Sequence, residues 1–254
     1  ALVTSSIGMA ILPKVAAHAA RGNFARVRTI ATLSIGTVIW MMSPIAALGA
    51  LFAFDAVRLV VGGSIDVLSI GATADLLRLL LLGLVAHGII SVAIRLFYGL
   101  RDTLRPTLAE VCGCLVIFGF ATLWFPAFGV SGIAMALPFG TWIQAIALVG
   151  LLARRSQIVH AATILKMIIF AVAASLASGG LAVLVTSSFM EPARQAGVLT
   201  GTVAAGVGTI VGLAAYVGLT VLARRQEALP VLRVVASQLP PKVRALLLRG
   251  DASS

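Results

Sequence analysis

The sequence predicts an all-α fold: a polytopic membrane helix bundle of about six full transmembrane helices plus a partial one at the N-terminus. Hydrophobic residues make up 60% of the 254 positions, charged residues make up only 11%, and the mean hydropathy is +1.11. Soluble domains carry about a quarter charged residues, so this composition indicates a membrane protein. The apolar runs are continuous and lack the alternation of membrane β-strands, which span with only about 10 residues.

The first region, residues 1–28, is predicted to hold the end of a helix and a basic loop. Its apolar run, ALVTSSIGMAIL, is expected to stop at Pro13. Because a membrane crossing takes about 20 residues, this run is expected to be the tail of a helix that starts before Ala1. The chain is therefore expected to be a fragment.

The second region, residues 29–222, is predicted to be a bundle of six spans. Each apolar run is long enough to cross about 30 Å of hydrocarbon. The expected spans are 30–54, 76–97, 107–125, 130–152, 164–185 and 198–222. Pro44 and Pro138 lie within two of them and predict kinks, because proline removes a backbone hydrogen bond.

The third region, residues 223–254, is predicted to be a basic amphipathic tail. Its segments LPVLRVVASQL and KVRALLLRG place arginines and a lysine among leucines and valines. Such a pattern suits a helix lying on anionic membrane lipids of the inner leaflet. A linker toward a further soluble domain is the alternative.

The basic residues predict the orientation. Sixteen of the nineteen lysines and arginines fall before the first span, in alternate connections, or after the last span. The positive-inside rule makes that side cytoplasmic, so the C-terminus is expected to be cytoplasmic and the loop around 55–75 to lie outside. The net charge of +11 is thus attributed to topology. Nucleic acid is not expected as a partner, because no long basic stretch is interleaved with aromatic residues.

The stretch RLFYGLRDTLRP, residues 95–106, is the most informative motif. It supplies five candidates for a substrate or gate site: Arg95, Tyr98, Arg101, Asp102 and Arg105. Charged groups this close to hydrocarbon tend to face a bundle interior, a water-filled cavity or the head-group layer. The residues alone leave two interpretations open, a functional site and a loop that only fixes orientation.

Other polar residues within the spans are few. His87, Glu110 and Gln144 are the intramembrane candidates. A hydrogen-bonded interior histidine is favoured over a proton relay for His87, and Glu110 suits the start of a helix, where the dipole favours a carboxylate.

Small residues recur at near-helical spacing in the last span, at Gly201, Gly208 and Gly212. Such residues let helices approach closely in lipid. Plain helix packing is favoured over a groove for a ligand.

No residue pattern supports an enzyme. The chain offers no paired carboxylates, no Ser/His/Asp set and no phosphate-cradling glycine loop. Cys112 and Cys114 point to different faces of one helix, so neither a disulfide nor a metal site is expected. No cofactor is predicted.

The order of motifs resembles the MurJ/MviN family of lipid II flippases. The segments that carry the resemblance are GMAILPKVAAHAARGN, VGGSIDVLSIGATADLL, RLFYGLRDTLRPT and FGVSGIAMALPFGTWIQAIAL. The resemblance covers residues 1 to about 225, and RLFYGLRDTLRPT is its tightest part.

The resemblance implies a two-lobe exporter of fourteen helices with a cationic central cavity. This chain would supply most of the second lobe and the last two helices, which line a groove for the lipid tail in the family. The missing N-terminal lobe of the same protein would be its partner. Some members carry Asn and Asp sodium ligands on the helix matching 107–125, but VCGCLVIFGFATLWF contains neither residue.

The implied function is transport of a lipid-linked peptidoglycan precursor, lipid II, across the bacterial plasma membrane by alternating access. A cationic cavity can hold its pyrophosphate by charge-assisted hydrogen bonds. The alternatives are another lipid-linked oligosaccharide or drug exporter of the same superfamily, and a membrane scaffold that recruits cell-wall regulatory proteins through its tail.

Overall fold

A computed structural model describes residues 2–61, 66–156, 159–196 and 198–222, and in these ranges the chain is helical and contains no strand. The predicted tail, 223–254, lies outside the described residues. The helices are α1 (Leu2–Ala20), α2 (Phe24–Leu51), α3 (Ala53–Val61), α4 (Val67–Leu81), α5 (Leu84–Gly99), α6 (Leu104–Phe128), α7 (Val130–Ser156), α8 (Ala161–Ala196) and α9 (Val198–Leu222). The all-α prediction is confirmed.

Six segments are long and apolar enough to cross a membrane, as predicted. They are Phe24–Leu51, Val67–Gly99, Leu104–Phe128, Val130–Arg154, Ala162–Ser187 and Gly201–Leu222. The span predicted at 76–97 is built from two helices, α4 and α5, which are separated by a break at Leu82 and Gly83. The short helix α3 was not predicted.

The first helix differs from the prediction, because α1 does not stop at Pro13 but runs through it to Ala20. Packing explains the continuation. Val15 is fully buried, and a Cβ placed on Gly99 of α5 would lie 2.7 Å from a Val15 methyl carbon. The close contact with α5 therefore stabilises α1 after Pro13 and offsets the one backbone hydrogen bond that proline removes. The predicted basic loop is correspondingly short, since α2 starts at Phe24 and includes Arg26 and Arg28.

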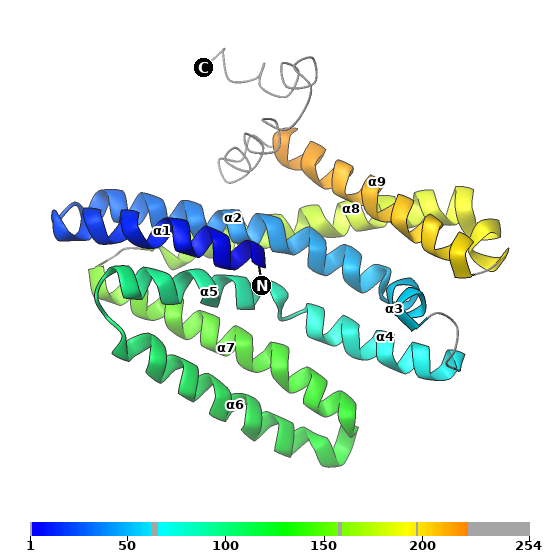
Figure 1. The fold of residues 1–254 in the computed structure, drawn as a ribbon, viewed down its shortest axis with the longest axis horizontal. Coiled ribbons are helices and arrows are strands. Elements are labelled where there is room, and N and C mark those ends of the chain that lie inside the picture. The colour runs from blue at the N-terminus through cyan, green and yellow to red at the C-terminus, as the bar shows by residue number, and fades with distance from the viewer. Residues whose placement is uncertain (1, 62–65, 157–158, 197, 223–254) are drawn as a thin grey trace.

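The helices lie side by side as an elongated bundle (Figure 1). Helices α1, α5 and α7 end, and α2, α6 and α8 begin, at one end of the bundle. We call it the basic end because Arg21, Arg101 and Arg154 lie at or next to these helix ends. The end of α3, the start of α4 and the α6–α7 connection lie at the opposite end. Neighbouring spans therefore run antiparallel, as a multi-pass membrane protein requires.

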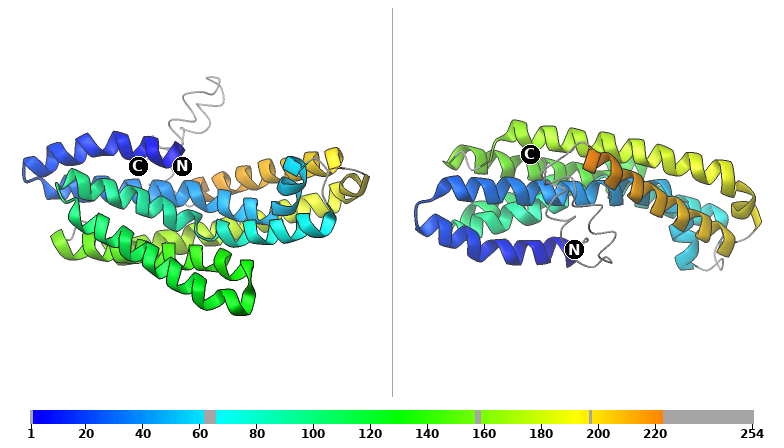
Figure 2. Two further views of the ribbon diagram at one scale, coloured as in Figure 1. Left: turned by 60° about the horizontal axis from the view of Figure 1, so that its bottom comes forward. Right: turned by 90° about the horizontal axis from the view of Figure 1, so that it is seen from above.

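The core of the bundle is formed by α2 and α5. Their buried apolar residues form one cluster with residues of α1, α7 and α8, including Ile35, Ile39, Ile89, Leu96 and Leu148. The α6–α7 hairpin lies at the edge of the bundle (Figure 2). Within α6 only Pro106 and Gly113 are buried, so most of the surface of this helix is not covered by other helices of the chain.

Candidate functional site

Helix α5 carries its polar residues on one side. Its four polar side chains are His87, Ser91, Arg95 and Tyr98, and its other residues are apolar or glycine. At 100° per residue these four positions fall within a sector of about 80°. We call them the α5 polar face. The other sides of α5 are packed by α1, α2 and α7.

The α5 polar face is open in this chain. His87 and Tyr98 are exposed, Ser91 and Arg95 are half-buried, and the residues on the other sides of the helix are buried. Polar and ionisable side chains at membrane depth face protein or water rather than lipid. The α5 polar face is therefore suited to a water-filled cavity or to another part of the protein.

Arg95 is turned along the helix toward the middle of the span. Its Nη1 donates to the carbonyl oxygen of Ser91 at 2.8 Å and to the Ser91 Oγ at 2.5 Å. A lone arginine near a membrane surface usually extends toward water. Here the Ser91 contacts hold the positive charge one helical turn deeper. Sequence reasoning missed Ser91, although its four-residue spacing from Arg95 was the available signal.

The connection from α5 to α6 begins with a Schellman turn. Arg101 N–H donates to the Tyr98 carbonyl and Asp102 N–H donates to the Phe97 carbonyl, each at 3.0 Å. The turn places Arg101 at φ +58°, in the left-handed region. Glycine usually occupies this position because a Cβ is strained there.

Asp102 caps the next helix. Its Oδ1 accepts a hydrogen bond from Arg105 N–H at 3.2 Å, and its Oδ2 lies 3.5 Å from Arg105 Nη1. The Asp102 side chain is only 12% exposed, while that of Arg105 is 46% exposed. Asp102 thus pairs with Arg105 and also has a structural role at the start of α6.

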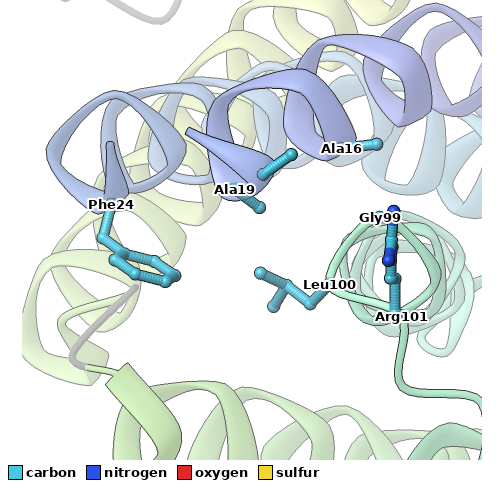
Figure 3. A pocket seen from close by; sticks show the side chains of 7 residues that line it. Ala16, Ala19, Phe24, Gly99, Leu100 and Arg101 are labelled. Carbon is cyan, nitrogen blue, oxygen red and sulfur yellow. The ribbon is translucent and has the colours of Figure 1, made fainter. Parts of the chain in front are cut away.

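A pocket of about 480 Å³ lies beside this connection, at the basic end. Phe24 and Leu100 point into it from opposite sides (Figure 3). Its walls are the last turns of α1, the start of α2 and the end of α5, and its lining residues are Ala16, Ala19, Ala20, Phe24, Gly99, Leu100 and Arg101. Arg101 is the one polar side chain among these lining residues, so the polar part of the pocket surface comes from its guanidinium and from the backbone.

The three intramembrane candidates do not form one cluster. His87 is exposed on α5, which differs from the interior position favoured for it, and Glu110 is exposed on α6. Gln144 is buried at the α6–α7 contact, where a Cβ on Gly113 would lie 2.6 Å from its Oε1. Gln144 therefore fills space between two helices. Cys112 and Cys114 are free thiols on the exposed surface of α6.

The glycines of α9 serve helix packing. A Cβ on Gly208 would lie 2.7 Å from a ring carbon of Phe52, and one on Gly212 would lie 2.6 Å from a methyl carbon of Leu48. Gly201 is buried as well. Leu48 of α2, Phe52 directly after it and Thr186 of α8 thus occupy the space over Gly208 and Gly212.

The fold and the α5 polar face define a class of protein: a multi-pass helical membrane protein with a row of polar side chains on one open face of a spanning segment. A family model described as lipid II flippase MurJ matches residues 1–204. The chain belongs to this family, as the sequence motifs predicted, and the family consists of transporters rather than enzymes.

Two individual proteins illustrate the relationship. A probable lipid II flippase MurJ from Rhizobium tropici is 25% identical over 218 residues, which cover 85% of this chain and 41% of that protein. A solved structure of a lipid II flippase MurJ in an inward closed conformation matches with a TM-score of 0.68 at 17% identity, covering 88% of this chain and 46% of that one. The chain therefore spans less than half the length of either relative.

Proposed function

We propose that this chain is the C-terminal lobe of a lipid II flippase, which moves the lipid-linked peptidoglycan precursor across the bacterial plasma membrane by alternating access. The upstream half of the protein would supply the other lobe. The α5 polar face carries the proposal, because it presents an arginine, a histidine, a serine and a tyrosine on the one uncovered side of a membrane helix. The basic end is cytoplasmic in this proposal, in agreement with the positive-inside rule.

Arg95 is the residue we assign to the pyrophosphate of the substrate. Its hydrogen bonds use Nη1, and among the described residues Nε and Nη2 have no partner. A guanidinium presents its donors in a planar fork that matches phosphate oxygens. The arrangement can therefore bind a phosphate while Ser91 keeps the guanidinium in place.

The remaining proposed partners are inferred from the positive charge of the tail and of Arg95. The basic tail after Leu222 would rest on anionic lipids of the inner leaflet, which attract lysine and arginine near the surface. Recruitment of cell-wall regulatory proteins by this tail would be a further role. Another lipid-linked oligosaccharide is the main competing substrate, since it presents the same phosphate chemistry to Arg95.

The test measures lipid II translocation by the intact protein in vesicles. Arg95→Ala should lower the rate at least tenfold, because a charge-assisted hydrogen bond is worth about 1.5–3 kcal/mol. Arg105→Ala removes the same charge at the same end of the bundle and should leave most of the rate. Equal rates for Arg95→Ala and the unaltered protein would refute the assignment. Faster transport of a lipid-linked oligosaccharide lacking the peptide would instead favour the competing substrate.

The same assay separates two roles of Asp102. Asn keeps the side-chain oxygen that caps α6 but removes the charge. If Asp102 acts only as a cap, Asp102→Asn should transport normally and Asp102→Ala should not. If its charge closes a gate, both variants should fail while the amount of protein in the membrane stays the same. We expect the first result, because the capping geometry is already in place.

A further inference from the structure

Pro44 leaves a backbone acceptor unpaired inside a membrane helix. In α2 the N–H of residue 44 would normally bond to the carbonyl of Trp40, four residues earlier. Proline has no N–H, so this bond is missing. Water is excluded from hydrocarbon, and a backbone carbonyl there needs a donor from elsewhere in the protein.

Tyr216 of α9 supplies that donor. Its hydroxyl donates to the Trp40 carbonyl oxygen at 3.0 Å, across 176 positions of sequence. The Tyr216 side chain is almost fully buried, and its ring lies 5.7 Å from that of Trp40, centroid to centroid. The bond therefore joins α9 to α2 at the residue that proline leaves without a partner.

We call this contact between Tyr216 and Trp40 the α2–α9 joint. The neighbouring contacts determine how the two helices are aligned there. Trp40 and Leu48 of α2, and Phe52 directly after it, meet residues 216, 212 and 208 of α9 in antiparallel order. Gly212 makes room for Leu48 and Gly208 makes room for Phe52. The two glycines bring the helices close enough for the tyrosine to reach the carbonyl, while α8 packs on both helices.

We propose that Tyr216 is a positioning residue for transport: by replacing the missing N–H of Pro44, it fastens the α8–α9 pair to α2, so that the three helices move as one body. This proposal rests on the proposed function for its effect on transport. The joint itself rests only on the geometry around Trp40.

A double-mutant cycle in the intact protein tests the joint. Tyr216→Phe removes the hydroxyl and keeps the ring, and Pro44→Ala restores the backbone N–H. Tyr216→Phe should slow lipid II transport about fivefold to tenfold, as expected for the loss of one net hydrogen bond. Pro44→Ala together with Tyr216→Phe should transport like Pro44→Ala alone, because the helix then satisfies Trp40 itself. Thr209→Val removes another hydroxyl of α9, one that donates to the Ala205 carbonyl of the same helix, and should have no effect.

A distance measurement between α2 and α9 tests the joint independently of transport. Spin labels would be placed at the exposed positions Thr29 of α2 and Leu222 of α9, with serine at Cys112 and Cys114. The distance distribution should broaden in Tyr216→Phe, and the same change should broaden it much less when position 44 is alanine, because α2 then satisfies the Trp40 carbonyl itself. An equal effect of Tyr216→Phe with proline or alanine at position 44 would overturn the proposal, and so would an unchanged distribution. Failure of the unaltered protein to transport lipid II would overturn only the proposed function.

Discussion

At the residue scale, two turns at the basic end use the same design with different residues. In the α1–α2 turn, Gly22 takes the left-handed position at φ +68°, and Asn23 accepts from Arg26 N–H at the start of α2. In the α5–α6 turn, Arg101 takes the left-handed position and Asp102 caps the next helix. Arginine thus stands where glycine would be less strained, and strained residues often mark functional sites.

Arg101→Gly should therefore stabilise the protein by about 1 kcal/mol, the lower end of the cost of a left-handed non-glycine residue. Gly22→Ala should destabilise it by a similar amount, because the alanine would be forced into the same conformation. Thermal unfolding of the detergent-purified protein gives both values. Arg101→Ala keeps the strain and removes the charge, so it separates the two contributions. A lower melting temperature for Arg101→Gly would show that the side chain outweighs the strain.

At this scale the sequence predicted candidate site residues but not their geometry. The motif RLFYGLRDTLRP identified Arg95, Tyr98 and Asp102 because charges beside apolar runs are conspicuous. It could not reveal the contact between Arg95 and Ser91, which depends on side-chain direction. Tyr216 was missed entirely, since its partner is a backbone carbonyl 176 positions away.

At the element scale, the break between α4 and α5 is the least predictable feature. The apolar run continues through Leu82, so hydropathy gives no sign of an interruption. Tertiary contacts stabilise the break. Trp142 Nε1 of α7 donates to the Leu82 carbonyl at 3.0 Å, and Gly83 lies against Pro138 of the same helix. The six spans were predictable from apolar length, whereas this interruption depends on a neighbouring helix.

Gly83→Ala should destabilise the protein by about 1–3 kcal/mol, the usual cost of overpacking. A Cβ at position 83 would lie 3.0 Å from both the Pro138 Cα and the Thr141 Oγ1. Gly71→Ala provides a matched control in α4, because a Cβ there meets nothing within 4 Å. Thermal unfolding of the two variants should differ clearly. Similar melting temperatures would mean that α7 can move away from the break at little cost.

At the scale of the whole molecule, the basic residues of the connections between helices gather at one end of the bundle. Arg21, Arg101 and Arg154 lie at the basic end, and the turn at Gly129 lies at the other. The alternation of basic residues along the sequence thus corresponds to a spatial separation in the fold. Membrane proteins with such a separation place the basic side in the cytoplasm.

Single cysteines in a background without Cys112 and Cys114 should report this orientation in intact cells. A cysteine at exposed Ser131, beside the α6–α7 turn, should react with a membrane-impermeant thiol reagent from outside. A cysteine at exposed Thr103, in the α5–α6 connection, should react only after the membrane is opened. The reverse pattern would invert the proposed orientation and place the basic end outside.

The one-sided packing of α6 also bears on the biogenesis of the protein. Only 6% of its membrane-spanning window is buried, and its main neighbour is α7, which follows it in the chain. During synthesis α6 thus enters the bilayer before its principal partner exists. Its apolar surface, which exposes Leu108, Leu115 and Phe118, suits the helix to hydrocarbon before α7 is present. The short turn at Gly129 then delivers α7 directly beside it, so that the hairpin can form as a unit and dock through α7 onto helices that are already inserted.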